Sequence, residues 1–106
     1  LGDFWQSKTS LPIPLGGIVI KRNIPGLIQN KVQRLISDSL NFAISHPDSS
    51  EDFVLKNSQE MDYKVVKNHI NLYVNDFSLS LGKKGRESVL RLFNEFNMNT
   101  TNIFLS

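Results

Sequence analysis

The sequence predicts an α/β fold to which this chain of 106 residues contributes several helices and one strand. The decapeptide Leu11–Ile20 places two prolines and two glycines before an apolar triplet, which is typical of an extended entry into a buried strand. After residue 25, apolar residues recur at the spacing typical of amphipathic helices. Because a strand buried on both faces needs strand neighbours, we expect its partners to lie elsewhere in a larger protein.

The first elements follow from the prolines and from the apolar triplet. Residues 1–10 are predicted to form a polar loop, in which Phe4 and Trp5 pack as a hydrophobic plug. The strand is expected over about 13–20, where it crosses from one half of the larger protein to the other. Lys21–Asn23 then turns the chain out of the strand.

A long helix is predicted over about 25–46. Pro25 suits a first-turn position because its missing N–H group would be unpaired there, and Pro47 ends the helix at or before His46. The residues expected on its inward face share three- and four-residue spacing: Ile28, Val32, Leu35, Ile36, Leu40, Ala43 and Ile44. Such a helix commonly packs across a sheet.

Shorter helices are predicted over about 50–58, 62–75 and 82–96. Asp62 and Ser80 carry side chains that suit the N-caps of the last two. The apolar residues expected to be buried are Phe53, Val54, Val65, Val66, Ile70, Tyr73, Val89, Leu92, Phe93 and Phe96. Residues 76–81 alternate apolar and polar side chains, which predicts a short extended edge piece.

The composition argues against several classes of protein. Lys plus Arg total 12 against 10 Asp plus Glu, so the net charge is +2 and no basic stripe is present for a nucleic acid or a membrane surface. The chain has no cysteine, which excludes disulfides and thiol chemistry and mildly favours the cytoplasm. No apolar run approaches the roughly 20 residues that span a bilayer. We expect a cytoplasmic chain without nucleic-acid or membrane partners.

The titratable residues offer little chemistry of their own. His69 falls on an apolar helix face, where a hydrogen-bonded core histidine is favoured over a base or ligand, and His46 is best explained as a helix-end residue. The acidic residues fall on presumed solvent faces and turns: Asp38, Asp48, Glu51, Asp52 and Glu60. The stretch Gly82–Arg86 lacks the spacing of a phosphate-binding loop, so a solvated first turn is favoured over an anion site. No metal site is expected.

Several short motifs, taken together and in order, resemble a known family. They are Leu1–Trp5, Leu11–Ile18, His46–Pro47, Gln59–Asp62 and His69–Leu79. Each is weak alone, but their order and spacing resemble the C-terminal part of the menaquinone-biosynthesis family of the futalosine pathway, in particular its 1,4-dihydroxy-6-naphthoate synthases. The similarity extends from Leu1 to about Phe96.

The resemblance implies a two-lobed, periplasmic-binding-protein-like fold, of which residues 1–106 would be a mostly helical C-terminal segment with one crossing strand. It implies a lyase that converts cyclic dehypoxanthinyl futalosine to 1,4-dihydroxy-6-naphthoate without a cofactor. The catalytic histidine of the family lies upstream of the region resembled, so no catalytic residue is expected here and the fragment alone is predicted to be inactive. Its expected partners are the small-molecule substrate and an N-terminal lobe.

The resemblance also places Pro14, Leu15, Gly16 and Gly17 near the cleft or hinge, where they are the candidate substrate-binding residues. A close strand crossing would demand glycine at 16 and 17 equally well. An unpaired strand edge would allow a homodimer. Three alternatives stay open: a solute-binding protein of the same fold, a chorismate dehydratase of the same pathway, and a small helical interaction module.

Overall fold

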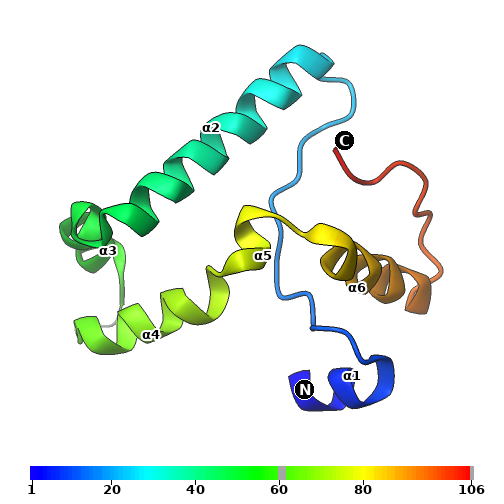
Figure 1. Cartoon of the computed structure of the whole chain (residues 1–106), viewed down its shortest axis with the longest axis horizontal. Coiled ribbons are helices and arrows are strands. Elements are labelled where there is room, and N and C mark those ends of the chain that lie inside the picture. The colour runs from blue at the N-terminus through cyan, green and yellow to red at the C-terminus, as the bar shows by residue number, and fades with distance from the viewer. Residues whose placement is uncertain (60–61, 106) are drawn as a thin grey trace. The chain divides into compact units, whose positions relative to one another are not determined.

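The computed structural model describes residues 1–59 and 62–105, and in these ranges the chain is mainly helical (Figure 1). Contacts divide it into two compact units, which are described separately here. The first unit contains Leu1–Ile24 and the described residues from Ser80 onward, and the second is Pro25–Leu79. The helices are α1 (Gly2–Thr9), α2 (Gly26–Ser45), the 3₁₀ helix η1 (Pro47–Ser50), α3 (Glu51–Asn57), α4 (Tyr63–Tyr73), α5 (Asp76–Leu79) and α6 (Gly82–Glu95).

The strand predicted over 13–20 is wrong for this structure, because the described residues contain no strand. Residues 12–21 instead form an extended segment with no regular secondary structure. The physical reason is that a strand exists only when a neighbour pairs with its backbone, and the described chain supplies no such neighbour. Ile18 and Val19 are accordingly 81% and 93% exposed. The predicted homodimer required a strand edge that two copies could share. The described residues contain no such strand, and the homodimer stays a prediction.

The polar loop predicted for residues 1–10 is also wrong, since these residues form helix α1. Asp3 in its first turn and Lys8 in its last complement the helix dipole. Ser10 ends the helix in the left-handed conformation at φ 58°, and its N–H group donates to the Gln6 carbonyl. Phe4 is 66% exposed, so the predicted plug is reduced to the half-buried Trp5.

Helix α2 begins after Pro25 and ends where Pro47 was expected to end it. The Pro25 carbonyl accepts hydrogen bonds from the N–H groups of Ile28 and Gln29 at 2.9 and 3.1 Å. His46 is the C-cap residue, and its N–H group donates to the Phe42 carbonyl at 2.8 Å. The 20 residues of the helix make it roughly 30 Å long. None of them is buried, so the apolar face predicted from its spacing is open in this structure.

Asp62 caps helix α4 as predicted, with its carboxylate accepting a hydrogen bond from the Lys64 N–H group at 2.9 Å. Val66 is the buried residue of this helix, whereas Val65 and Tyr73 on the predicted inward face remain about half exposed. The extended edge piece predicted over 76–81 is wrong, because Asp76–Leu79 forms α5. Its cause is Asn75, whose side-chain oxygen accepts from the Phe77 N–H group at 3.0 Å and starts the turn.

Helix α6 begins at the predicted residue, Gly82, but without the predicted cap. Leu81 is its N-cap residue and makes no side-chain capping bond, so Ser80 does not cap the helix. Gly82 adopts a φ of 60°, a left-handed conformation that glycine reaches without a steric penalty. Val89, Leu92 and Phe93 are half-buried as one face, but Phe96 is 69% exposed, contrary to its predicted inward position.

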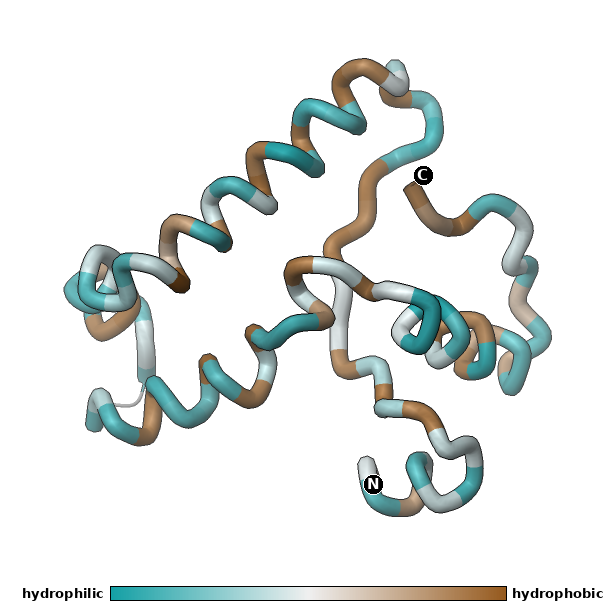
Figure 2. The backbone as a smooth tube through the Cα atoms, in the orientation of Figure 1, coloured by the Kyte–Doolittle hydropathy of each residue, from teal (hydrophilic) through white to brown (hydrophobic). Residues whose placement is uncertain are grey.

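Little of the described chain is buried. Val66, Gly85 and Ser88 are its buried residues. Figure 2 shows apolar residues recurring along α2, and an apolar run in the extended segment that a hydrophilic stretch separates from the helix. Within the ranges described, no helix is both long and apolar enough to cross a membrane.

We expect Asp62→Ala to lower the free energy of unfolding by about 1 kcal/mol, because the substitution leaves N–H groups at the start of α4 without their acceptor. The measurement is urea denaturation of the longest encoded protein that carries this chain. Asp62→Ser retains an oxygen that can cap the helix and is the matched control. Equal losses for the two variants would contradict the capping role.

Candidate functional site

The candidate substrate-binding residues lie on the extended segment between α1 and α2. The start of this segment is hydrogen-bonded to both α1 and α6, whereas the residues that follow are exposed. Pro14 is half-buried, whereas Leu15, Gly16 and Gly17 are exposed. Just before them, the Pro12 carbonyl accepts hydrogen bonds from Trp5 Nε1 at 3.1 Å and from the Ser88 hydroxyl. The segment is therefore fixed on α1 and α6 at Pro12 and becomes free of such contacts within a few residues.

The two glycines have no close neighbour in the described structure. A Cβ atom built on Gly16 or Gly17 would meet no other atom within 4 Å. A close crossing among the described residues of their own unit therefore does not explain the glycine pair. The space beside them is open to a group outside the described residues, such as a ligand or another part of the protein.

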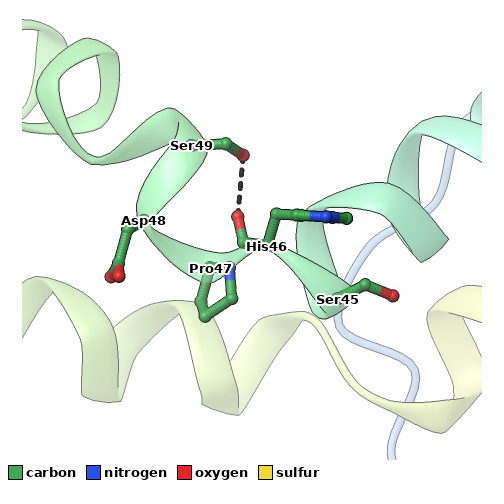
Figure 3. A pocket seen from close by; sticks show the side chains of 5 residues that line it. All are labelled: Ser45, His46, Pro47, Asp48 and Ser49. Atoms are coloured by element: carbon green, nitrogen blue, oxygen red, sulfur yellow. Dashed lines mark hydrogen bonds between the residues drawn. The ribbon is translucent and has the colours of Figure 1, made fainter.

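His46 lies in a shallow pocket with Ser45, Pro47, Asp48 and Ser49 (Figure 3). Its ring stacks on Phe42 with 4.4 Å between centroids, and Nδ1 lies 3.2 Å from the Phe42 carbonyl oxygen. Ser49 donates its hydroxyl to the His46 carbonyl at 2.7 Å. Figure 3 shows the Asp48 carboxylate and the His46 ring pointing in different directions. The pair therefore forms no acid–base dyad, and His46 is a helix-end residue as predicted.

His69 is not the core histidine that its position on α4 predicted, because it is exposed. The centroid of its ring lies 4.6 Å from that of Tyr73, one helical turn later, and the two rings are tilted by 44°. Helix periodicity placed His69 on the same face as Val66 and Tyr73, but only Val66 is covered in the described structure. Among the described residues, no carboxylate is hydrogen-bonded to this imidazole as one would be to orient a general base.

The acidic residues do not gather into a site. Asp38, Asp48 and Asp52 are exposed and Glu51 is half-buried, while Glu60 lies outside the described residues. No group of three or more possible metal ligands occurs in the part of the chain that the structure describes. A second shallow pocket, lined by Asp3, Gln6 and Ser7 of α1, likewise offers one carboxylate without a catalytic partner.

The basic start of α6 is partly engaged by the C-terminal tail. Arg86 lies over the Phe104 ring at 5.0 Å, and its Nη2 donates to the Leu105 carbonyl at 3.3 Å. Arg22 donates to the Thr101 carbonyl at 3.1 Å. These contacts attach the C-terminal tail to Arg22 and Arg86. Arg86 therefore has a structural role, and no anion site is assigned to it.

The contacts of Pro12 are the feature that sequence analysis missed. A serine in an amphipathic helix carries no signal for a distant carbonyl, and Ser88 lies 76 positions from Pro12. A partial signal was the pair Gly85 and Ser88, two small residues one turn apart on the same face as larger apolar ones. Small residues at that spacing let another backbone approach a helix closely.

Comparison with known proteins places this chain in a family. The profile of the family described as menaquinone biosynthesis matches residues 1–97. The chain belongs to this menaquinone biosynthesis family. Its extended segment, its helices α1 to α6 and its candidate substrate-binding residues all fall within the matched range.

Two curated members of the menaquinone biosynthesis family are similar to this chain, and both are named 1,4-dihydroxy-6-naphthoate synthase. The protein of Thermus thermophilus is 35% identical over 95 residues, which cover 90% of this chain and 35% of the relative. The protein of Streptomyces coelicolor is 35% identical over 89 residues, which cover 84% of this chain and 32% of the relative. The chain thus spans about a third of the length of these curated relatives.

Among the described ionisable groups, the one with a clearly shifted pKa is Tyr63, the first residue of α4. Partial burial, together with the negative charges of Glu51 and Asp48, raises the pKa of the Tyr63 phenol above its ordinary value of 10.0. We expect absorbance titration to show an ionisation above pH 10.0 that disappears in Tyr63→Phe and moves to lower pH in Asp48→Asn. Asp38→Asn is the matched control, because it removes a charge elsewhere. An unchanged Tyr63 titration in Asp48→Asn would contradict the contribution assigned to the Asp48 charge.

Proposed function

We propose that this chain is the C-terminal part of a 1,4-dihydroxy-6-naphthoate synthase, a lyase that converts cyclic dehypoxanthinyl futalosine to 1,4-dihydroxy-6-naphthoate in menaquinone biosynthesis. The observation that carries the proposal is the 35% identity, over 90% of this chain, to a relative with that name. The family match over residues 1–97 supports it independently. Both curated relatives carry the synthase name, which favours this activity over chorismate dehydratase or solute binding.

The whole protein in this proposal has two lobes around a cleft, in the manner of periplasmic binding proteins. Support comes from the surface that the described residues leave uncovered. On α2, Ile28, Val32, Leu35, Ile36 and Ile44 are all more than a third exposed, although they share one face at helical spacing. Burial of such a face gains roughly 25 cal/mol per Å² of apolar surface, so a further part of the protein would be stabilised by covering it.

The small-molecule substrate would lie between the lobes, near Pro14, Leu15, Gly16 and Gly17. The open surroundings of the two glycines support this placement, because a ligand or the opposite lobe can approach their backbone without meeting a side chain. The exposed Leu15 next to them would then supply apolar contact to the aromatic part of the substrate.

The chemistry of this reaction requires proton abstraction next to a carbonyl and expulsion of a sugar-derived group, both of which a positioned histidine can serve. We place that histidine outside this chain. The surroundings of His46 and His69 support the assignment. Each ring lies against an aromatic ring one helical turn away, and among the described residues no carboxylate is hydrogen-bonded to either imidazole.

The decisive experiment compares the isolated 106-residue chain with the longest encoded protein that carries it. Each is incubated with cyclic dehypoxanthinyl futalosine, and 1,4-dihydroxy-6-naphthoate is followed by absorbance and mass. We expect turnover by the longer protein and none by the isolated chain. Binding without conversion would favour a solute-binding protein, and dehydration of chorismate would favour the sister enzyme. Turnover by the isolated chain would contradict the location of the base.

Substitution of the two histidines tests the location of the base more directly. We expect His46→Gln and His69→Gln in the longer protein to keep kcat within about twofold of the unsubstituted value, because neither imidazole is placed for proton transfer. The same assay measures the outcome, with circular dichroism as the check on folding. A loss of about a hundredfold or more in a folded variant would place the general base on that residue.

A further inference from the structure

We propose that the Pro12 carbonyl is a clamp point that orients the candidate substrate-binding residues, and that Ser88 is the positioning residue that sets it. The inference rests on the proposed function, because it assigns Ser88 a role in the same site. Ser88 lies on α6 and does not itself belong to the extended segment. Its hydrogen bond would fix the orientation of the Pro12 peptide group. That orientation would set the direction in which Pro14–Gly17 extends from α1 and α6.

The clamp consists of two donors on one acceptor. A carbonyl oxygen has two lone pairs, and here the indole N–H group of Trp5 and the hydroxyl of Ser88 both donate to Pro12. Trp5 belongs to α1 and Ser88 to α6, so the oxygen joins the segment to two helices at once. Two donors from different directions fix the orientation of the peptide plane better than either donor alone.

Burial makes the Ser88 bond costly to lose. Ser88 is only 2% exposed, although serine is usually a surface residue. Gly85, one turn earlier, is also buried, and the two small side chains let the segment approach the helix closely. Removal of the Ser88 hydroxyl would leave the half-buried Pro12 carbonyl with the Trp5 donor alone. The Ser88 hydroxyl is therefore needed to hold the Pro12 carbonyl on α6.

Neighbouring contacts hold the same few residues. The Leu11 N–H group donates to Thr9 Oγ1 at 3.2 Å, and Thr9 Oγ1 donates to the Trp5 carbonyl at 2.8 Å. The Ile13 side chain lies beside Gly2 of α1, where a built Cβ atom would be 3.5 Å from Ile13 Cγ2. The segment from Leu11 to Ile13 is thus held on α1 as well as on α6.

After Pro14, the segment has no such contacts with α1 or α6. From Leu15 to Val19, the backbone makes no hydrogen bond with the described residues, and Leu15, Ile18 and Val19 are exposed. Pro12 and Pro14 each have φ restricted to about −65°, so the chain between the clamp and Gly16 has few free dihedral angles. An orientation fixed at the Pro12 peptide is therefore carried to the residues proposed to meet the substrate.

Loss of the clamp would impair substrate binding more than the chemical step. The clamp holds a binding segment and lies away from any group proposed to move a proton. We expect Ser88→Ala to raise KM about fivefold and to change kcat less than about twofold, the pattern of lost uniform binding. Trp5→Phe removes the second donor, keeps an aromatic ring and should shift KM in the same direction.

The experiment uses the longest encoded protein that carries this chain. Steady-state kinetics with cyclic dehypoxanthinyl futalosine are measured for Ser88→Ala, Trp5→Phe and Ser39→Ala. Ser39→Ala is the matched control, because it makes the same chemical change at an exposed position of α2. We expect the control to leave KM within about twofold, since exposed substitutions seldom perturb a distant site.

Amide hydrogen exchange of Leu11, whose N–H group is bonded to Thr9 Oγ1 directly before Pro12, gives a readout that does not depend on activity. We expect Ser88→Ala and Trp5→Phe each to accelerate this exchange about fivefold, with no change in Ser39→Ala. Unchanged exchange and unchanged KM in both clamp variants would overturn the proposal, as would an equal effect of the control. If the protein turns over no substrate at all, the proposed function fails, and the exchange experiment alone still decides for or against the clamp.

Discussion

The structure depends on one physical constraint: its helices make more apolar surface than the described chain can bury. Val66, Gly85 and Ser88 are its buried residues, and two of these three have almost no apolar side chain to contribute. A chain of this size usually gains its stability from a shared core. Here each unit is organised chiefly by helix caps, turns and a few hydrogen bonds. The open faces are the strongest physical support for a larger protein built around this segment.

Helices were the predictable part of the fold. The predicted range 25–46 is observed as Gly26–Ser45, and 82–96 as Gly82–Glu95, because apolar periodicity and the flanking prolines are local properties. The strand over 13–20 could not form for the opposite reason. A run of isoleucine and valine favours an extended backbone, but a strand forms only when a neighbouring strand pairs with that backbone. The short helix α5 was missed because Asn75 starts its turn without any apolar repeat, and α1 was missed because its eight residues carry no apolar repeat.

The candidate site was predictable only in outline. Prolines and glycines marked Pro14–Gly17 as unusual, and the family resemblance gave that stretch a possible purpose. The small residues Gly85 and Ser88 were only a partial signal that α6 is closely approached. That Trp5 and Ser88 converge on Pro12 could not be predicted, since contacts between residues so far apart depend on tertiary packing. His69 shows the converse error, in which a correct helical face led to an incorrect burial. A face at helical spacing indicates where a partner would bind and does not supply that partner.

The indole in this arrangement has a practical consequence. Trp5 is the only tryptophan of the chain, and its N–H group is bonded to the Pro12 carbonyl. Fluorescence emission from an indole responds to hydrogen bonding and to the polarity around it. The chain therefore contains an intrinsic optical reporter beside the segment of greatest interest, and motion of that segment could be followed without an attached dye.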